Sequence, residues 1–239
     1  SSDVYSFNFN YLSETTAKAT FSHTFVNDRT TAKIHLFKVD KETGVAIPQG
    51  DATLEGSVYG VYAREDIVHP DGATGVVFKA NDLIATITTD ANGEAEVNNL
   101  YLGNYYVKEI TPPVGYLLDE EEHDVVCDYE GDMVAEVSRS TTSAEEVIKQ
   151  PFQLIKVSDN GEDTEAPTLE SAGFTVYLKS ALSVKEDGSY NFDEAEPVVI
   201  GANGETQLFT DSKGHLVTTP IPYGTYVVIE TVTPKDMET

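Results

Sequence analysis

Short runs of β-branched and aromatic residues alternate with turn residues along most of the chain. Runs rich in Val, Ile, Thr, Tyr and Phe are separated by turn dipeptides such as Asn92-Gly93, Asn160-Gly161 and Asn203-Gly204. Strands of this composition and spacing are typical of antiparallel sandwiches. No amphipathic helix longer than about two turns is evident, and segment 142–148 is compatible with a helical turn or a strand. The pattern predicts an all-β fold of immunoglobulin-like sandwiches.

An internal repeat indicates that the chain holds more than one sandwich. In segments Asp90–Glu109 and Asp211–Glu230 the aspartate and the glutamate are 19 positions apart, and glycines recur ten apart at Gly93 and Gly103 and again in the second copy. Upstream, the Leu-Phe-Lys-Val-Asp run that contains Lys38 matches a Leu-Ile-Lys-Val-Ser run that contains Lys156. Self-similarity of this kind indicates tandem modules.

The two copies differ in completeness. The first continues past Glu109 to a last strand expected near 145–150, whereas the second reaches residue 239 without matching strands. The start of the chain is similar to the closing half of a preceding copy. We therefore expect closing strands of a preceding module, or a swapped or disordered tail, at 1–28, a complete module at 29–150, and a second module lacking its last strand at 151–239.

Composition and charge limit the possible partners. The 239 residues include 15 Lys and Arg against 41 Asp and Glu, which gives a net charge of −26. A chain this acidic has no basic patch with which to neutralise phosphates, so nucleic acid is excluded as a partner. No run approaches the ~18 apolar residues of a bilayer span, so we expect no membrane insertion in this segment. With 40% hydrophobic residues the chain can form packed cores.

The sequence offers no pattern for a metal or a cofactor. Cys127 is the single cysteine, and strand alternation places it on the same face as apolar neighbours. We therefore expect a buried core residue and not a reactive thiol. The five histidines lack ligand spacing, and the acidic clusters at 119–122 and 159–163 lack the spacing of a calcium loop and read as solvated turns. We expect no metal, no cofactor and no enzymatic cleft.

Strand phase places a lysine and a glutamate on one face in each copy. Lys38 alternates in phase with Ile34 and Leu36, and Glu109 with Tyr105 and Val107; Lys156 and Glu230 repeat the arrangement. A buried amine and carboxyl must pair or become neutral. A neutral amine beside a polarised carboxamide can form an amide crosslink. The alternative is that each Lys–Glu pair lies at the surface, where an ion pair contributes little to the free energy of folding.

The ordered motifs resemble a known family. The Gly-Ser-Val-Tyr-Gly-Val-Tyr run at 56–62 and the segment Tyr105–Tyr116 resemble the B-type repeats of collagen-binding adhesins and the SpaA-type pilin modules, the second run matching the family's E-box. The second copy has Lys235-Asp236 where the family usually has Gly-Tyr. The resemblance implies prealbumin-like sandwiches on Gram-positive cell-wall-anchored proteins, often stabilised by a self-formed Lys–Asn isopeptide bond. By resemblance, Lys38 and Lys156 are the bond-forming lysines, and Glu109 and Glu230 the catalytic glutamates.

The acceptor is where the sequence departs from the family. The last stretch of the complete module, 145–151, contains no Asn or Asp, and Gln150 at the acceptor position is one methylene longer, which misplaces its carbonyl. We therefore do not expect the bond there in the form that the family pattern predicts. Asn27 does match the acceptor, but for the preceding module. Asn27 of one molecule could complete the second module of another by strand addition, next to Lys156; a disordered tail is the alternative.

These inferences predict a structural role outside the cell. We expect a stalk segment of a cell-wall-anchored adhesin or pilin-like protein, which contacts neighbouring modules and projects a distal binding region. The alternative is an adhesin domain that binds a host or matrix protein or a glycan through long loops such as 63–79 and 183–204.

Overall fold

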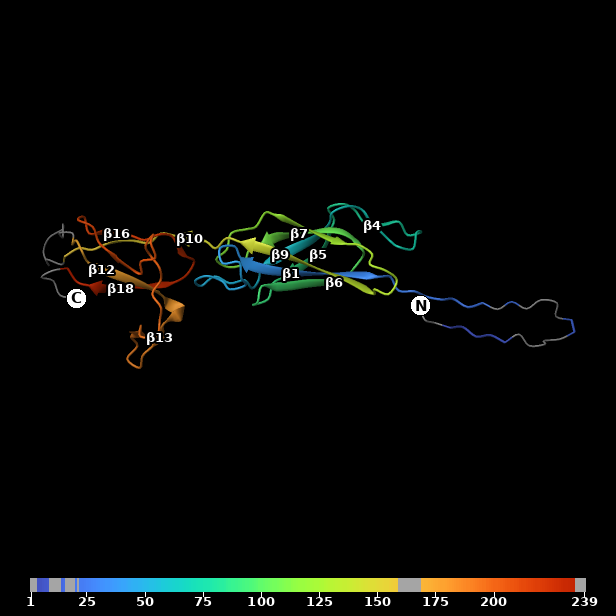
Figure 1. The fold of residues 1–239 in the computed structure, drawn as a ribbon, viewed down its shortest axis with the longest axis horizontal. Helices are drawn as coiled ribbons and strands as arrows, with labels where there is room; N and C mark the ends of the chain where they lie inside the picture. Colours follow the sequence, from blue (N-terminus) through green and yellow to red (C-terminus); the bar gives the residue numbers. More distant parts are fainter. Residues whose placement is uncertain (1–3, 9–13, 16–19, 21, 159–168, 235–239) are drawn as a thin grey trace.

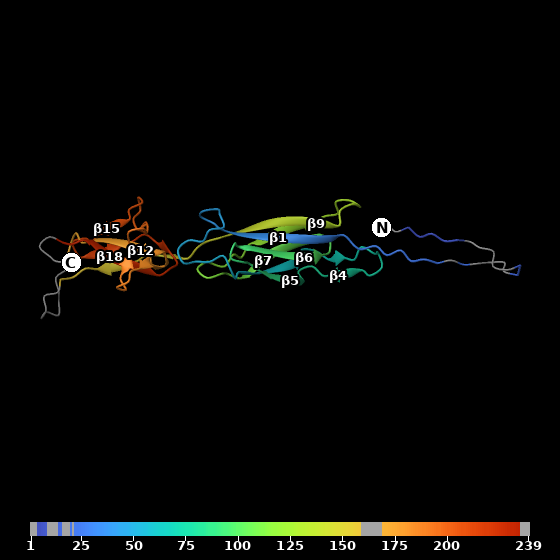
Figure 2. The same cartoon turned by 90° about the horizontal axis from the view of Figure 1, so that it is seen from below.

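The computed structural model describes residues 4–8, 14–15, 20, 22–158 and 169–234. These residues form β-strands and loops, with a single short 3-10 helix, η1 (Lys179–Ala181), among them. Figure 1 shows two groups of strands that follow each other along the long axis of the molecule, with the described part of the N-terminal segment beyond the far end of the first group. Figure 2 shows the same succession from below. The all-β prediction is confirmed.

The first group is a sandwich of two main sheets, ordered β6-β1-β9 and β5-β2-β7-β8, with a small β3-β4 hairpin at one end. Its strands are β1 (Thr31–Asp40), β2 (Val58–Ala63), β3 (Ile67–Val68), β4 (Val76–Phe78), β5 (Leu83–Thr88), β6 (Glu94–Leu100), β7 (Gly103–Thr111), β8 (Glu122–Cys127) and β9 (Glu136–Glu145).

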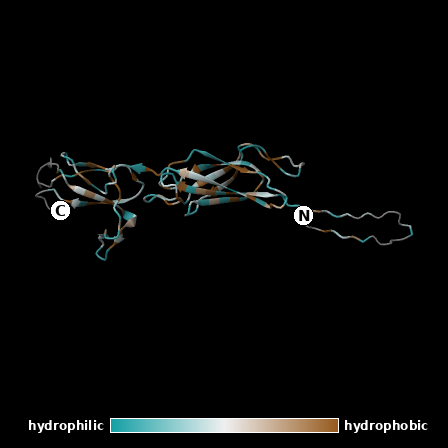
Figure 3. Cartoon of the chain, viewed as in Figure 1, coloured by the Kyte–Doolittle hydropathy of each residue, from teal (hydrophilic) through white to brown (hydrophobic). Residues whose placement is uncertain are grey.

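Alternation of burial along β1 shows how the sequence builds this sandwich. Every second residue from Ala32 to Asp40 is buried, so that Ile34 and Leu36 enter the apolar core while Lys38 occupies the next inward position. The core packs these side chains against both sheets and includes Cys127, which is buried as expected. Hydropathy colours in Figure 3 show the hydrophobic positions lying within the strands of both groups.

The closing strand of the first sandwich lies earlier than the sequence suggests. The expected last strand was near 145–150, but β9 ends at Glu145 and pairs in parallel with β1, with Lys38 opposite Ser143 and Asp40 opposite Glu145. Most of β9 is Ser, Thr and charged residues, and only Val137, Ser143 and Glu145 are buried. This polar composition hides the strand from a search for apolar alternation.

The second group repeats the order of the first. Sheet β16-β11 corresponds to β6-β1, and sheet β15-β12-β18 corresponds to β5-β2-β7. The remaining elements are the β10-β17 pair and the β13-β14 hairpin. The strands are β10 (Lys149–Gln150), β11 (Gln153–Ile155), β12 (Gly173–Leu178), β13 (Ser183–Val184), β14 (Tyr190–Asn191), β15 (Gln207–Phe209), β16 (His215–Val217), β17 (Ile221–Pro222) and β18 (Tyr226–Val232).

Individual hydrogen bonds also recur in both sandwiches. The amide of Lys38 donates to the carbonyl of Gly93 at 2.8 Å, and the amide of Lys156 donates to the carbonyl of Gly214 at the same distance. The hydroxyl of Thr89 donates to a loop carbonyl at 2.6 Å, as Thr210 does at 2.7 Å. The repeat in the sequence is thus a repeat in three dimensions.

The two ends of the chain differ from the complete sandwich. Among residues 150–158 and 169–234, no strand pairs with the second edge of β11, where β9 would lie in the first sandwich. In the described part of 1–28 no residue belongs to a strand. The expected closing strands of a preceding module at 1–28 and the missing last strand at 151–239 remain interpretations of the sequence.

Candidate functional site

The interior of the first sandwich holds three ionisable side chains that meet from three strands. Lys38 comes from β1, Glu109 from β7 in the opposite sheet, and Glu145 from the end of β9. All three side chains are fully shielded from solvent. The parallel register places Glu145 two residues beyond the partner of Lys38, on the same inward face.

Lys38 contacts both carboxylates. Its Nζ lies 3.3 Å from Glu109 Oε1 and closer still to Glu145 Oε1. The Tyr59 hydroxyl lies 3.4 Å from the same nitrogen, and the ring centroids of Tyr59 and Tyr116 lie 5.8 Å and 5.5 Å from it. The two aromatic rings separate the amine from water.

Glu145 is held by hydroxyl groups on one of its two oxygens. Tyr59 donates to Glu145 Oε1 at 2.5 Å, and Ser143 donates to the same oxygen at 3.3 Å. The other oxygen, Oε2, is buried and has no hydrogen-bond partner among the described residues. The two oxygens of this carboxyl are therefore in different environments.

Both carboxylate oxygens of Glu109 accept hydrogen bonds, unlike those of Glu145. Its Oε1 accepts a hydrogen bond from the Ser57 hydroxyl, and its Oε2 accepts one from the amide of Asp119 at 2.9 Å. Asp119 Oδ2 in turn lies 3.0 Å from the Ser143 hydroxyl, whose single proton it shares with Glu145, and 2.9 Å from His123 Nε2. A chain of polar contacts thus leads from the buried site toward the surface.

Burial sets the electrostatics of the site. Loss of hydration lowers the pKa of Lys38 to about 8, against the opposing attraction of Glu109. The same burial raises the pKa of Tyr59, so its hydroxyl stays protonated and can only donate to the carboxylates. One amine and two carboxyls share a dry pocket, so full ionisation would leave an uncompensated negative charge.

The second sandwich carries a more open version of this pair. Lys156 Nζ lies 2.8 Å from Glu230 Oε2, with side-chain exposures of 26% and 17%. Register places Phe174 opposite Glu230 as Tyr59 lies opposite Glu109. Ala172 donates its amide to Thr210 as Ser57 does to Thr89. The second pair therefore lacks the two hydroxyls of the first.

The structure corrects the expected position of Gln150. Gln150 lies in β10, is exposed and pairs with Ile221, whereas the residue that the closing strand brings to Lys38 is Glu145. The reason is the early end of β9: Val147 still pairs with Tyr116 of the first sandwich, and by Gln150 the chain pairs with the second. Asn27 is exposed at the far end of the first sandwich, in a pocket with Arg29 and Tyr101.

Sequence reasoning placed Lys38 beside Glu109, and Lys156 beside Glu230, as the structure has them. The sequence did not point to Glu145, because the acceptor that the family resemblance implies is an Asn or Asp and because the expected last strand, 145–150, lies later than β9. It also missed Tyr59, Ser57 and Asp119. The alternation of Tyr59 with Val61, on a strand next to that of Glu109, is a signal that could have found the first of these.

Other kinds of site are not seen in the described part of the chain. No group of three or more His, Cys, Asp or Glu side chains there could hold a metal ion. No helix among the same residues has the length and hydropathy of a membrane span.

Comparison with known families decides the relationship of the chain. Its sequence matches the family described as SpaA, Prealbumin-like fold domain, in two segments, residues 18–141 and 150–239. The chain belongs to this SpaA family. The prealbumin-like fold and the resemblance to SpaA-type modules are thereby confirmed, and the two matched segments agree with the two sandwiches. No protein among the curated ones searched is similar to this chain.

Several solved structures are similar to the chain at low sequence identity. The Bacillus anthracis TIE protein is 23% identical with a TM-score of 0.51, over 86% of this chain and 29% of that one. A streptococcal ancillary pilin is 24% identical (TM-score 0.34; 87% and 56% covered), and the Lactobacillus rhamnosus GG shaft pilin SpaA is 16% identical (TM-score 0.34; 86% and 89% covered). The chain thus spans less than a third of the TIE protein's length.

Proposed function

We propose that this SpaA-family chain is a structural stalk segment of a pilin-like or adhesin protein anchored to a Gram-positive cell wall. Its role is to hold a distal binding region at a distance from the cell. The observation that carries the proposal is the junction between the two sandwiches, which joins them end to end through several hydrogen bonds (Figure 1).

Asp51 is the centre of this junction. It lies in the first sandwich, yet its amide donates to the carbonyl of Tyr223 at 2.9 Å. Its carboxylate accepts from the amide of Thr225 at 2.7 Å and from the hydroxyl of Ser180. One side chain thus binds two segments of the second sandwich, and a rigid connection is what a spacer requires.

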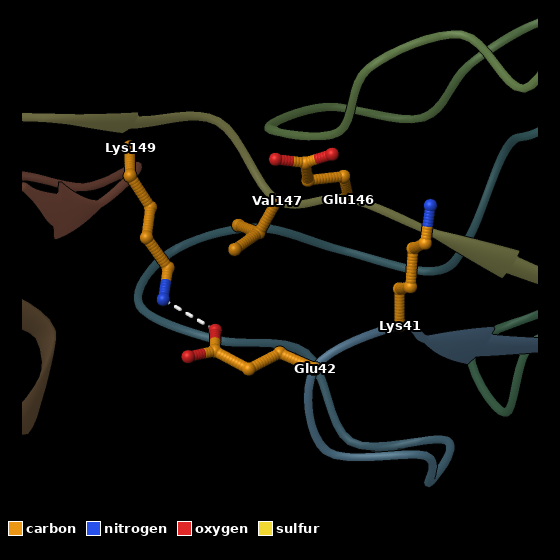
Figure 4. Close-up of a pocket in the computed structure, with 5 residues that line it drawn as sticks. All are labelled: Lys41, Glu42, Glu146, Val147 and Lys149. Atoms are coloured by element: carbon orange, nitrogen blue, oxygen red, sulfur yellow. Dashed lines mark hydrogen bonds and ion pairs between the residues drawn. The ribbon is translucent and has the colours of Figure 1, made fainter.

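Close backbone approach strengthens the same junction. Gly50 and Gly115 have positive φ angles of 62° and 88°, and a Cβ at either position would overlap Tyr223. The connecting strand β10 pairs with β17 of the second sandwich. Figure 4 shows Lys149 of β10 facing Glu42 of the first sandwich, with which it forms an ion pair. A hinge at this point would break all of these contacts.

Small-angle X-ray scattering tests the proposed role. A stalk segment should scatter as one elongated particle whose maximum dimension stays constant between low and high salt. A compact particle, or a distribution of dimensions typical of two freely rotating bodies, would contradict the proposal.

The family's crosslink by a Lys–Asn bond takes a particular form in this proposal. The described N-terminal segment, which contains Asn27, and the second sandwich, which contains the Lys156–Glu230 pair, lie at opposite ends of the elongated molecule (Figure 1). Addition of the Asn27 segment to the edge of β11 with which no described strand pairs therefore requires a second molecule. Intact mass measurement tests this: a covalent dimer that has lost ammonia, about 17 Da, supports it, and a monomer only, at high protein concentration, contradicts it.

Direct binding of a host or matrix ligand is the second candidate. The β13-β14 hairpin projects from the side of the second sandwich (Figure 1) and exposes Val184. Binding residues are found disproportionately on loops that a rigid scaffold holds in place, as the second sandwich holds this hairpin. A binding screen against matrix proteins and glycans, with a chain in which 184–190 is replaced by Gly and Ser as control, distinguishes this candidate from a pure spacer.

A further inference from the structure

The buried site of the first sandwich places a nucleophile in contact with an acyl group. Lys38 Nζ touches the carboxyl of Glu145, and neither side chain is accessible to solvent. An amine and a carboxylic acid in water remain as separate ions. Held together where water is excluded, they react with the advantage of proximity, and the ionic state loses the hydration that favours it.

The environments of the two Glu145 oxygens show which of them would stay on Cδ if the amine displaced the other. Oε1 accepts hydrogen bonds from Tyr59 and Ser143, as an amide oxygen would. Oε2 is buried without a partner among the described residues, which is a costly arrangement for a carboxylate oxygen. Removal of Oε2 as water would leave every remaining polar atom of this group bonded.

We propose that Lys38 and Glu145 form an intramolecular amide bond with loss of water, so that β1 and β9 are covalently joined through a glutamate acceptor. The proposal deepens the stalk role proposed above and rests on it for its biological purpose. It differs in two ways from the Lys–Asn bond that the family resemblance implies. The acceptor is a glutamic acid, whose side chain is one methylene longer than that of Asn, and the leaving group is water instead of ammonia.

The reaction balances with the groups present. A proton moves from the Lys38 ammonium to Glu145, which gives a neutral amine and a carboxylic acid. The Nζ lone pair then forms a bond to Glu145 Cδ, and the Cδ–Oε2 bond breaks. Glu109, 3.3 Å from Nζ, accepts the amine proton and returns it to the departing hydroxyl, which leaves as water. No oxidant or further reactant is needed.

Tyr59 and the fixed position of Glu109 assist this step. The Tyr59 hydroxyl points at Oε1, the oxygen on which negative charge develops as the amine adds to Cδ. Ser57 and the Asp119 amide hold the Glu109 carboxylate at Lys38. The product replaces a buried cation and a buried anion with a neutral amide, which removes the cost of their dehydration.

The second sandwich serves as an internal comparison. Lys156 and Glu230 are paired and partly exposed, but Phe174 and Ala172 stand where the first site has its hydroxyls. Within residues 150–158 and 169–234, no strand corresponding to β9 brings a second carboxyl to this pair. We therefore expect a single bond of this kind per chain, in the first sandwich.

Mass spectrometry of the folded chain tests the proposal. The intact mass should be about 18 Da below the sequence mass, and the K38A and E145A variants should each have their full sequence masses, whereas K156A should keep the deficit. Trypsin should yield one branched product in which segment 34–41, uncleaved after Lys38, is joined to segment 140–149. The peptide map uses the unaltered chain, so it does not depend on whether a variant folds.

The outcomes separate this inference from the proposed role. A chain at its full sequence mass that is cleaved after Lys38, yet still scatters as a rigid elongated particle, would overturn the bond and leave the stalk role in place. A branched product in a chain that scatters as two loosely tethered bodies would support the bond and contradict the role. A deficit of about 17 Da, or a branch at another residue, would also overturn the assignment to Glu145.

Discussion

Tyr59 in one sheet donates a hydrogen bond of 2.5 Å to Glu145 in the other, across the interior of the first sandwich. The contact joins β2 to the end of β9, and Lys38 of β1 lies against both side chains. A hydroxyl that cannot readily ionise is a suitable donor here, because it stabilises a negative oxygen without adding a further charge to the pocket.

Replacement of Tyr59 by Phe should slow formation of the Lys38–Glu145 bond by about 10²–10³-fold, the range found when one donor to a developing oxyanion is removed. The chain can be refolded from urea, quenched in acid at intervals, and its mass deficit measured. Tyr105→Phe is the matched control, since that buried hydroxyl donates to the carbonyl of Tyr101 away from the site. Equal rates in the two variants would exclude a role for the Tyr59 hydroxyl.

The rate of bond formation should depend on pH in one direction. Below pH 8 the Lys38 amine and Glu145 share a proton, and the reactive neutral form has the same number of protons as the ion pair. Because burial lowers the pKa of Lys38 to about 8, the site loses this proton to solvent above that pH. Refolding followed by mass should therefore give a constant rate from pH 6.5 to 8 and about a tenfold fall per unit above it. A rate that rises with pH above 8 would contradict this scheme.

Lys38 and Lys156 should contribute different amounts to the free energy of unfolding. Lys38→Met leaves two buried carboxyls without a cation and removes the proposed bond, so the first sandwich should lose at least about 3–5 kcal/mol. Lys156→Met removes a partly exposed pair and should cost no more than about 1 kcal/mol. Urea unfolding, with hydrogen exchange to assign each transition to a sandwich, measures both. Similar losses for the two variants would argue against a special role for the first site.

The junction should loosen when Asp51 is replaced by Ala. The change removes the acceptor of Thr225 and Ser180, so scattering should report a wider range of dimensions while each sandwich stays folded. Asp187→Ala, in the turn of the β13-β14 hairpin, is the control. An unchanged scattering profile in Asp51→Ala would show that the glycine contacts and the β10-β17 pairing suffice.

Cys127 should be unreactive in the native chain. It is fully buried, and this burial raises the pKa of its thiol to about 11, so almost no thiolate forms at pH 8. Labelling with a disulfide reagent at pH 8 should be at least about 10²-fold slower for the folded chain than for the chain in urea. Rapid labelling without denaturant would mean that this part of the core opens readily.

Part of this fold is accessible from the sequence, because apolar alternation marks its strands. The phase of Ile34, Leu36 and Lys38 in β1 identifies the inward face, and the repeat aligns Lys156 and Glu230 with their counterparts without the structure. These features are local, within one strand or one turn, and they recur.

The rest depends on pairing between segments far apart in the chain. β9 carries mostly Ser, Thr and charged residues, so its parallel alignment with β1, and with it the approach of Glu145 to Lys38, has no local signature. The junction is equally non-local: Asp51 reaches Thr225 across 174 positions.

The parallel pairing of β1 with β9 has a mechanical consequence. Tension that enters at the start of β1 and leaves at the end of β9 pulls the two strands along each other in shear, so their ladder of hydrogen bonds resists as a set rather than opening one by one. With an amide between Lys38 and Glu145, the force path crosses directly from one strand to the other, and residues 39–144 carry none of it. The first sandwich would then lengthen under load by no more than the few residues on either side of the bond.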